Sequence, residues 1–291
     1  MTSICPVCLS SDLLKRPDAH WHVWEKTYSL AQCNQCGSAF TVDLPDDVTL
    51  ENFYRVAFDY RWYQDHLPAK IRDSEIRIQE YAKLLGRRVL DFGGGLGYFS
   101  QTARKYGYES VTYDPFAGGM APLENDWDTV VGLHMLEHAS DPDRICTQIK
   151  KFLKAGGRVI FAVPNFDGLG YRTFGMRWVW AQPPLMHVFH FTAKGLRALL
   201  TRHGFQDLEV SYHERWDANM FCDVENAAAT SRWDAAWGLR PFNAIPLYRK
   251  WIARHNSARR FEGLNHALAD FDKTCDQYAE LQITGILSAQ T

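Results

Sequence analysis

Short apolar runs alternate with helix-periodic segments through the middle of the chain. The apolar runs predict strands at residues 89–91, 109–114, 129–133, 158–165 and 206–213. The segments with helical spacing between them are residues 98–106, 142–153 and 192–203. Alternation of this kind predicts an α/β fold with a doubly wound, mostly parallel sheet. A last apolar run at residues 281–287 predicts one further strand of the same sheet.

Two stretches outside this alternation also have a helical pattern. Residues 51–85 follow a break at Leu44–Pro45 and are first aromatic, then amphipathic. The aromatic part is expected either to pack as core or to form a lid in which Tyr54 or Tyr63 touches a ligand. Residues 217–276 predict extra helices that carry a basic cluster. That cluster fits a solvated face or, alternatively, a site for a phosphate-bearing acceptor.

Composition narrows the class of protein. The 291 residues are 46% hydrophobic and 23% charged, as is usual for a globular chain long enough for one α/β domain and an appendage. A net charge of −2 supplies no global field toward nucleic acid or anionic lipid. There is no apolar run near the roughly 20 residues that span a bilayer, and no secretory signal pattern at the N-terminus. We therefore expect a cytoplasmic protein without a membrane partner.

A glycine-rich turn follows the strand predicted at 89–91. Gly93, Gly95 and Gly97 keep the spacing G-x-G-x-G after Asp91. A strand, a glycine-rich turn and a helix together let backbone N–H groups face a ligand. The dinucleotide fingerprint needs Gly or Ala where this chain has Tyr98, which argues against NAD or FAD. The alternative is a turn that serves only close packing of helix on strand.

The order of motifs after this turn resembles the class I S-adenosylmethionine (SAM)-dependent methyltransferases. The chain reads Val-Leu-Asp-x-Gly-x-Gly-x-Gly from residue 89, Leu-Glu-His from 136, Asp-Pro from 141 and Pro-Asn from 164. The resemblance implies a Rossmann-like sheet and SAM as cofactor. It also implies a set of cofactor-binding residues: Asp91, which braces the loop, and Gly93, Gly95, Gly97, Asp114 and Leu133. Asp114 ends the second strand, where a carboxylate can accept both ribose hydroxyls; a solvated strand-end acid is the alternative.

One part of the family pattern is missing. Only thirteen residues separate Asp114 from Asp128. A crossover helix alone needs about a dozen residues, so a further helix–strand–helix unit does not fit. We therefore expect edge strand 3 of the sheet to be trimmed or absent. The acid that usually contacts adenine is then absent too, and Met120 or Trp127 is expected to pack on adenine instead.

Four cysteines near the N-terminus have metal-ligand spacing. Cys5 and Cys8 form one C-x-x-C pair, Cys33 and Cys36 form a second, and 24 residues separate the pairs. Two such pairs close a tetrahedral Cys₄ shell around Zn²⁺, with a β-hairpin between them. The shell has no open position, so this zinc is expected to be structural. Unliganded thiols, or His20 and His22 as competing ligands, are the alternatives.

Histidines supply the candidate catalytic groups. His187 lies in a long aromatic segment at 170–192 and is the predicted general base, with His190 and His138 as competitors. A histidine that only fixes the loop is the alternative for His187. His134, Glu137 and His138 have one-turn spacing and could ligate a divalent metal, although capping or core roles are favoured.

These patterns together predict five segments. They are a zinc ribbon (1–43), a helical linker or lid (44–86), a SAM-binding α/β domain (87–216), a helical insertion (217–277) and a final strand (278–291). The predicted activity is O- or C-methylation of a small-molecule or sugar acceptor, because ribbon-bearing family members are often associated with sugar modification. A non-catalytic scaffold that has lost SAM binding and a nucleic-acid-modifying enzyme are the alternatives.

Overall fold

The structure is a computed structural model that describes residues 4–23, 26–57, 67–115, 121–178, 180–181, 184–213 and 280–288. The chain divides into two compact units. The first comprises residues 1–164, 183–211 and 281–291, and the second comprises residues 165–182 and 212–280. The helical insertion expected at 217–277 lies outside the described residues, as do Tyr63 and Met120.

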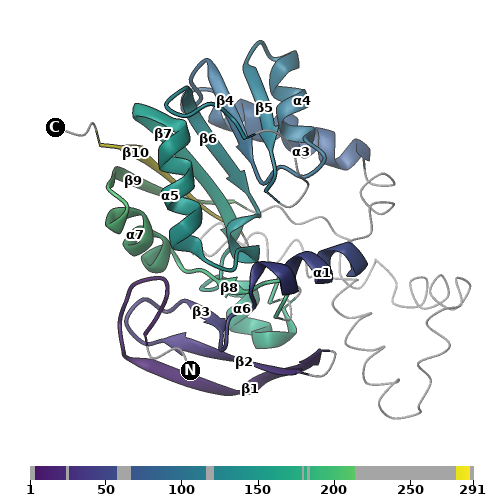
Figure 1. The fold of residues 1–291 in the computed structure, drawn as a ribbon, viewed down its shortest axis with the longest axis vertical. Coiled ribbons are helices and arrows are strands. Elements are labelled where there is room, and N and C mark those ends of the chain that lie inside the picture. Colours follow the sequence, from purple (N-terminus) through teal and green to yellow (C-terminus); the bar gives the residue numbers. More distant parts are fainter. Residues whose placement is uncertain are drawn as a thin grey trace, which may run out of the picture. The chain divides into compact units, whose positions relative to one another are not determined.

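The first unit contains a six-stranded sheet in the order β5-β4-β6-β7-β10-β9, apart from Tyr212, His213 and Glu280 at the ends of two strands (Figure 1). Its strands are β4 (Arg88–Phe92), β5 (Glu109–Tyr113), β6 (Trp127–Leu133), β7 (Leu153–Pro164), β9 (Phe205–His213) and β10 (Glu280–Leu287). The pairs β4–β5, β4–β6 and β6–β7 are parallel. This arrangement confirms the predicted doubly wound α/β sheet. Within the described residues the sheet begins at β5, which agrees with the expected loss of edge strand 3.

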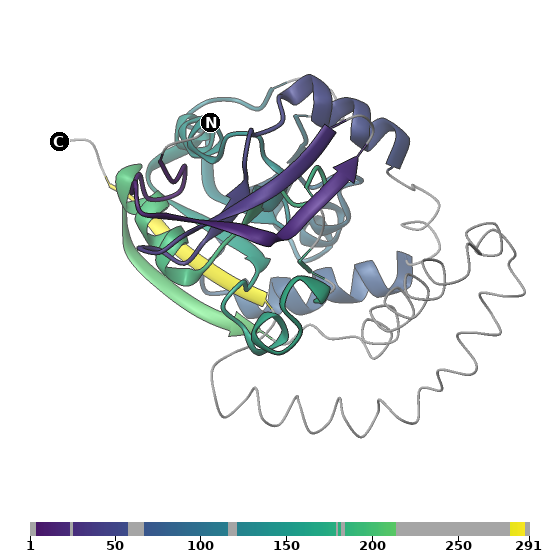
Figure 2. The same ribbon diagram turned by 90° about the horizontal axis from the view of Figure 1, so that it is seen from below.

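The last strand, β10, is inserted between β7 and β9, and Figure 2 shows it alongside β9. Ser288, just after β10, donates a backbone hydrogen bond to the carbonyl of Gly204, just before β9. The end of one strand therefore meets the start of the other, as in an antiparallel pair.

Helices cover both faces of this sheet. On one face, α3 (Leu67–Tyr81) and α4 (Tyr98–Lys105) share a buried cluster with the sheet through Ile78, Phe99 and Val131. On the other face, α5 (Pro142–Phe152) places Phe152 against Phe92 and Tyr113. Asp141 caps α5 by accepting hydrogen bonds from the first backbone N–H groups of the helix. The remaining helices of this unit are α1 (Asp47–Ala57), η1 (Leu136–His138) and α7 (Ala193–Arg202).

A second, four-stranded sheet joins the N-terminal segment to the α/β part of the chain. It has the order β1-β2-β3-β8, with β1 (Leu13–Val23), β2 (Lys26–Cys33), β3 (Ala39–Thr41) and β8 (Phe189–His190) (Figure 1). The hairpin of β1 and β2 fills the separation between the two cysteine pairs. The antiparallel pairing of β3 with β8 brings a strand from the far end of the sequence into the ribbon sheet.

Several boundaries differ from the sequence prediction. The first helix begins at Asp47 rather than near 51, directly after Asp46, which accepts a hydrogen bond from the Thr49 N–H. Strand β7 begins at Leu153 rather than 158, because Leu153 already pairs with Trp127 of β6. Gly156, with a φ of 74°, lies where the register between β6 and β7 shifts. Within the described residues no helix has the length and apolar character needed to cross a membrane.

Two local features differ from the sequence analysis. The aromatic segment at 170–192, to which no helix was assigned, begins within α6 (Leu169–Phe174) and continues into η2 (Gly175–Arg177) in the second unit, where Trp178 and Ala181 form a small buried cluster. Trp127 is not available for adenine. It is buried at the start of β6, at the opposite end of the strand from the glycine-rich turn, and donates its indole N–H to the Leu123 carbonyl.

Candidate functional site

The glycine-rich turn lies at the carboxyl end of β4. Gly93, Gly95 and Gly97 have φ values of 71°, 52° and 73°. Side chains other than glycine rarely adopt this left-handed region. Three such residues within five turn the chain sharply from β4 into α4, with Gly97 at the N-cap of the helix. The backbone of this turn is therefore arranged as the spacing in the sequence predicts.

Close neighbours hold the turn on two sides. A Cβ atom on Gly93 would lie 2.7 Å from the Met135 Cβ, and one on Gly97 would lie 2.6 Å from the Thr112 hydroxyl. A Cβ atom on Gly95 would meet nothing within 4 Å. The turn is thus fixed between the segment after β6 and the strand β5, while Gly95 faces open space.

The side chain of Asp91, at the end of β4, anchors the residues around the glycine-rich turn. Its side chain is buried, and Oδ2 accepts hydrogen bonds from the Ser100 N–H (3.3 Å) and the Thr112 hydroxyl (3.2 Å). Burial raises the pKa of Asp91 to about 7, because a charged carboxylate is poorly solvated there. These two bonds join α4 and β5 to the end of β4.

The other two predicted cofactor residues lie on neighbouring strands. Asp114 follows β5, is half-buried, and accepts a hydrogen bond at Oδ2 from the Gly95 N–H (3.0 Å). Leu133 ends β6 and is half-buried against the cluster that contains Val89 and Val131. Since β5, β4 and β6 are adjacent and parallel, the structure brings this whole predicted set to one edge of the sheet.

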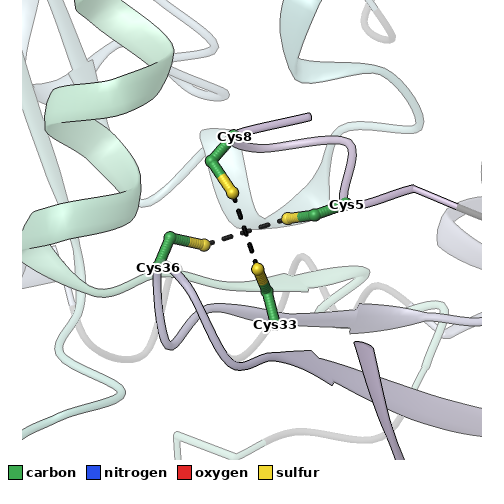
Figure 3. Close-up of side chains that lie close together, drawn as sticks. All are labelled: Cys5, Cys8, Cys33 and Cys36. Atoms are coloured by element: carbon green, nitrogen blue, oxygen red, sulfur yellow. Dashed lines mark hydrogen bonds between the residues drawn. The ribbon is translucent and has the colours of Figure 1, made fainter. Parts of the chain in front are cut away.

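The four cysteines converge on one point (Figure 3). The Sγ atoms of Cys5 and Cys36 are 3.8 Å apart, and those of Cys8 and Cys33 are 3.5 Å apart. A tetrahedral shell with metal–sulfur bonds of about 2.3 Å has sulfur–sulfur edges of about 3.8 Å. All four are free thiols. A hydrogen bond from the Cys5 thiol lowers the pKa of Cys36 to about 5, which favours a thiolate. The donor set fits a zinc ion.

Hydrogen bonds tie this cysteine cluster to the histidine segment. The Thr192 hydroxyl donates to the Cys36 carbonyl (2.5 Å), and the Thr192 N–H donates to the Ser38 hydroxyl (3.1 Å). The Thr41 N–H donates to the Val188 carbonyl (2.9 Å). Residues next to His187 and His190 are therefore held by the ribbon, a connection that no local sequence signal indicates.

The three candidate catalytic histidines divide into a pair and a more distant third. The rings of His138 and His187 are 4.8 Å apart, and the ring of His190 is 6.1 Å from that of His187. His187 is buried, whereas the His138 side chain is 27% exposed. Burial lowers the pKa of His190 to about 3. His190 is thus a poor proton acceptor, and His138 is the most accessible of the three.

Further groups surround this pair. The Tyr54 hydroxyl lies 2.6 Å from His138 Nδ1 and donates to the Met186 carbonyl (3.0 Å), so the first aromatic helix does reach this region. Glu137 is buried next to His138. His134 lies before η1 with a φ of 49°, so the one-turn spacing that the sequence suggests is not helical there. The sequence identifies Glu137 but not its proximity to His187.

Comparisons with known proteins agree with this geometry. A family described as a methyltransferase domain matches residues 63–210. Ubiquinone biosynthesis O-methyltransferase of Proteus mirabilis is 32% identical over 114 residues, covering 30% of this chain and 46% of that protein. The protein of the same name from Dechloromonas aromatica is 25% identical over 159 residues, covering 43% of this chain and 66% of that protein.

A solved structure is similar over a larger part of the chain. It is phosphoethanolamine N-methyltransferase 2 of Haemonchus contortus in complex with S-adenosylhomocysteine, with a TM-score of 0.52 and 10% identity over 93% of this chain and 71% of that chain. At this identity the similarity concerns the fold alone. The chain spans 46% and 66% of the two curated relatives, so their whole activities do not transfer directly.

Proposed function

This chain belongs to the SAM-dependent methyltransferase family, and on that premise we propose that it transfers a methyl group from SAM to a small-molecule or sugar acceptor. The observation that carries the proposal is the turn from Gly93 to Gly97. Its three left-handed glycines, its open side at Gly95 and its support by Asp91 form a cradle that a side chain would fill.

In this proposal the backbone of Gly93, Gly95 and Gly97 receives the methionine end of SAM. Asp114 accepts the ribose hydroxyls. Its carboxylate already accepts the Gly95 N–H and has further lone pairs available, so one side chain can serve both loop and ligand. Leu133 contributes an apolar contact at the end of the neighbouring strand β6.

The four cysteines hold a structural zinc ion in this proposal. Sulfur–sulfur distances of 3.5 and 3.8 Å suit a tetrahedral shell, and four thiolates leave no position for a substrate. The role of the metal is to fix the two C-x-x-C turns against the start of α7, where Thr192 contacts the Cys36 carbonyl.

Bound SAM supplies a methyl group on a positively charged sulfur, and the transfer is an in-line displacement. The chain's own residues therefore chiefly align the acceptor with that carbon and help its hydroxyl to lose a proton. We assign the second task to His138 and His187, which lie after β6 and before β8. His190 is not assigned this task, because burial lowers its pKa to about 3, and it forms part of β8.

A small acceptor is favoured by two observations. The net charge of −2 gives no electrostatic preference for nucleic acid. The curated relatives are named as O-methyltransferases of ubiquinone biosynthesis, which makes a hydroxyl the first acceptor group to test.

The test is product formation from labelled SAM with three groups of acceptors: hydroxylated aromatic compounds, nucleotide-activated sugars and structured RNA. The proposal expects turnover with one of the first two groups, and S-adenosylhomocysteine released in equal amount. Turnover with RNA alone would support the nucleic-acid alternative. If SAM binds but no acceptor is methylated, the function is SAM binding only. If SAM does not bind, the result favours the scaffold alternative, which the missing edge strand suggests.

A further inference from the structure

We propose that Glu137, His138 and His187 form a binding site for one divalent cation beside the glycine-rich turn. The ligand atoms of these three residues lie within 4.8 Å of one another. Around a common ion with bonds of about 2.0–2.2 Å, ligand atoms are roughly 3–4 Å apart. The side chains therefore need to close only slightly to share an ion.

The carboxylate of Glu137 is the strongest evidence. Its side chain is 2% exposed, and neither oxygen has a hydrogen-bond partner among the residues that the structure describes. Two ring nitrogens lie close to Oε1, His134 Nδ1 at 3.4 Å and His138 Nε2 at 3.9 Å. A buried, unpaired carboxylate is costly, and a cation at this position would remove the cost.

The orientation of the His138 ring also supports a cation site. Its Nδ1 lies next to the Met186 carbonyl oxygen and the Tyr54 hydroxyl. A carbonyl oxygen can only accept, so in the neutral ring the proton is on Nδ1 and Nε2 carries a lone pair. That lone pair and Glu137 Oε1 are two acceptors that face each other across 3.9 Å. A histidine that ligates a metal characteristically donates its other N–H to a backbone carbonyl in this manner.

The surroundings leave room for a reacting group. Glu137 and His187 are buried, but the His138 side chain is 27% exposed, so the site opens on that side. Three protein ligands leave further coordination positions, as in catalytic rather than structural sites. Met135, two residues before Glu137, packs on Gly93, so the segment that carries Glu137 and His138 adjoins the proposed SAM loop.

Two imidazoles and one carboxylate suit divalent first-row ions such as Mn²⁺, Fe²⁺, Co²⁺ or Zn²⁺. This inference rests on the proposed function only for the role of the ion. A cation held by His138 and His187 would lower the pKa of an acceptor hydroxyl beside it, so these two histidines would assist loss of the proton through the ion and not as proton acceptors themselves. The proton leaves to solvent, an oxygen–carbon bond forms to the methyl group, and the carbon–sulfur bond breaks with its electron pair passing to sulfur.

The test is titration of the full-length, zinc-containing protein with Mn²⁺, without SAM or acceptor, followed by electron paramagnetic resonance. Mn²⁺ prefers nitrogen and oxygen ligands and competes poorly for four thiolates, so the Cys₄ cluster does not obscure the result. We expect about one Mn²⁺ per chain, and the spin-echo spectrum should show coupling to imidazole nitrogen. Absence of binding at millimolar Mn²⁺, or binding without nitrogen coupling, would overturn the proposal.

Variants provide a second line of evidence. Glu137→Gln keeps the shape but loses the charge, and His187→Asn removes one imidazole; each should raise the Kd for Mn²⁺ about tenfold or more. His203→Asn is the matched control, since His203 pairs with Asp143 outside the cluster and should leave the Kd unchanged. Zinc content and circular dichroism establish that each variant is folded. An unchanged Kd in Glu137→Gln would contradict the assignment even if the wild type binds Mn²⁺.

The two proposals fail separately. If the protein binds SAM but not Mn²⁺, only the cation site is rejected. If it binds Mn²⁺ but not SAM, only the methyltransferase proposal is rejected.

Discussion

At the scale of single residues, Asp114 connects the glycine-rich turn to the end of β5 through its hydrogen bond from the Gly95 N–H. Asp114→Ala should weaken SAM binding by roughly 10²-fold, because two charge-assisted hydrogen bonds to the ribose are worth about 1.5–3 kcal/mol each before compensation by water. Asp114→Asn, which keeps the shape and one acceptor, should lose less. Calorimetric titration of both variants gives the comparison, and an unchanged Kd in Asp114→Ala would move the ribose contact elsewhere.

Asp91 predicts a pH dependence of stability. Its pKa in the folded chain is about 7, above the ordinary 3.8, so the folded state holds the proton more tightly than the unfolded state. This contribution is fully present below about pH 4 and is lost as the pH rises toward 7. Relative to Asp91→Asn, which cannot titrate, the wild type should lose on the order of 1 kcal/mol of unfolding free energy per pH unit in this window. Urea unfolding of the SAM-free proteins measures the difference; parallel pH profiles would disprove the assignment.

At the scale of elements, Thr192 joins the ribbon to α7. Its hydroxyl accepts the Gly195 N–H as the N-cap and donates to the Cys36 carbonyl. Thr192→Ala should lower the free energy of unfolding by about 1–2 kcal/mol, whereas Thr192→Ser keeps the hydroxyl and should lose clearly less. Denaturant unfolding decides between them. Equal losses in the two variants would mean that packing of the methyl group, not the hydrogen bonds, matters here.

The proposed zinc site predicts a local effect on the ribbon. Cys33→Ser should lose most of the roughly one zinc per chain and expose the amides of β2, β3 and β8 to hydrogen exchange. The turn after β4 should stay protected, because Asp91 and Thr112 hold it without the ribbon. Cys146→Ala changes a buried cysteine outside the cluster and should keep its zinc. Wild-type protein without metal and with undiminished stability would rule the zinc site out.

At the scale of the whole molecule, the sheet was predictable because its signals are local. The glycine spacing after Asp91 permits the left-handed φ values that the turn adopts, and the short segment between Asp114 and Asp128 excludes a further crossover by chain length alone. The doubly wound α/β sheet that these signals and the family resemblance imply is confirmed.

The contacts that the sequence did not reveal join residues that lie far apart along the chain. Ser38 and Thr192 are 154 positions apart, and Tyr54 and His138 are 84 apart. No periodicity or spacing encodes such contacts, since they arise only when β3 pairs with β8 and α1 packs near η1. The buried position of Glu137 between histidines belongs to this class, which is why core and metal roles could not be separated from sequence.

The central claim is that this fold holds SAM at the glycine-rich turn. Calorimetric titration of the wild-type protein with SAM and with S-adenosylhomocysteine tests it most directly. The account predicts one site per chain for each ligand, with affinity that falls in Asp114→Ala and is retained in His203→Asn. Absence of heat and of competition between the two ligands at millimolar concentration would contradict it, and would mean that the glycine-rich turn only packs α4 on β4.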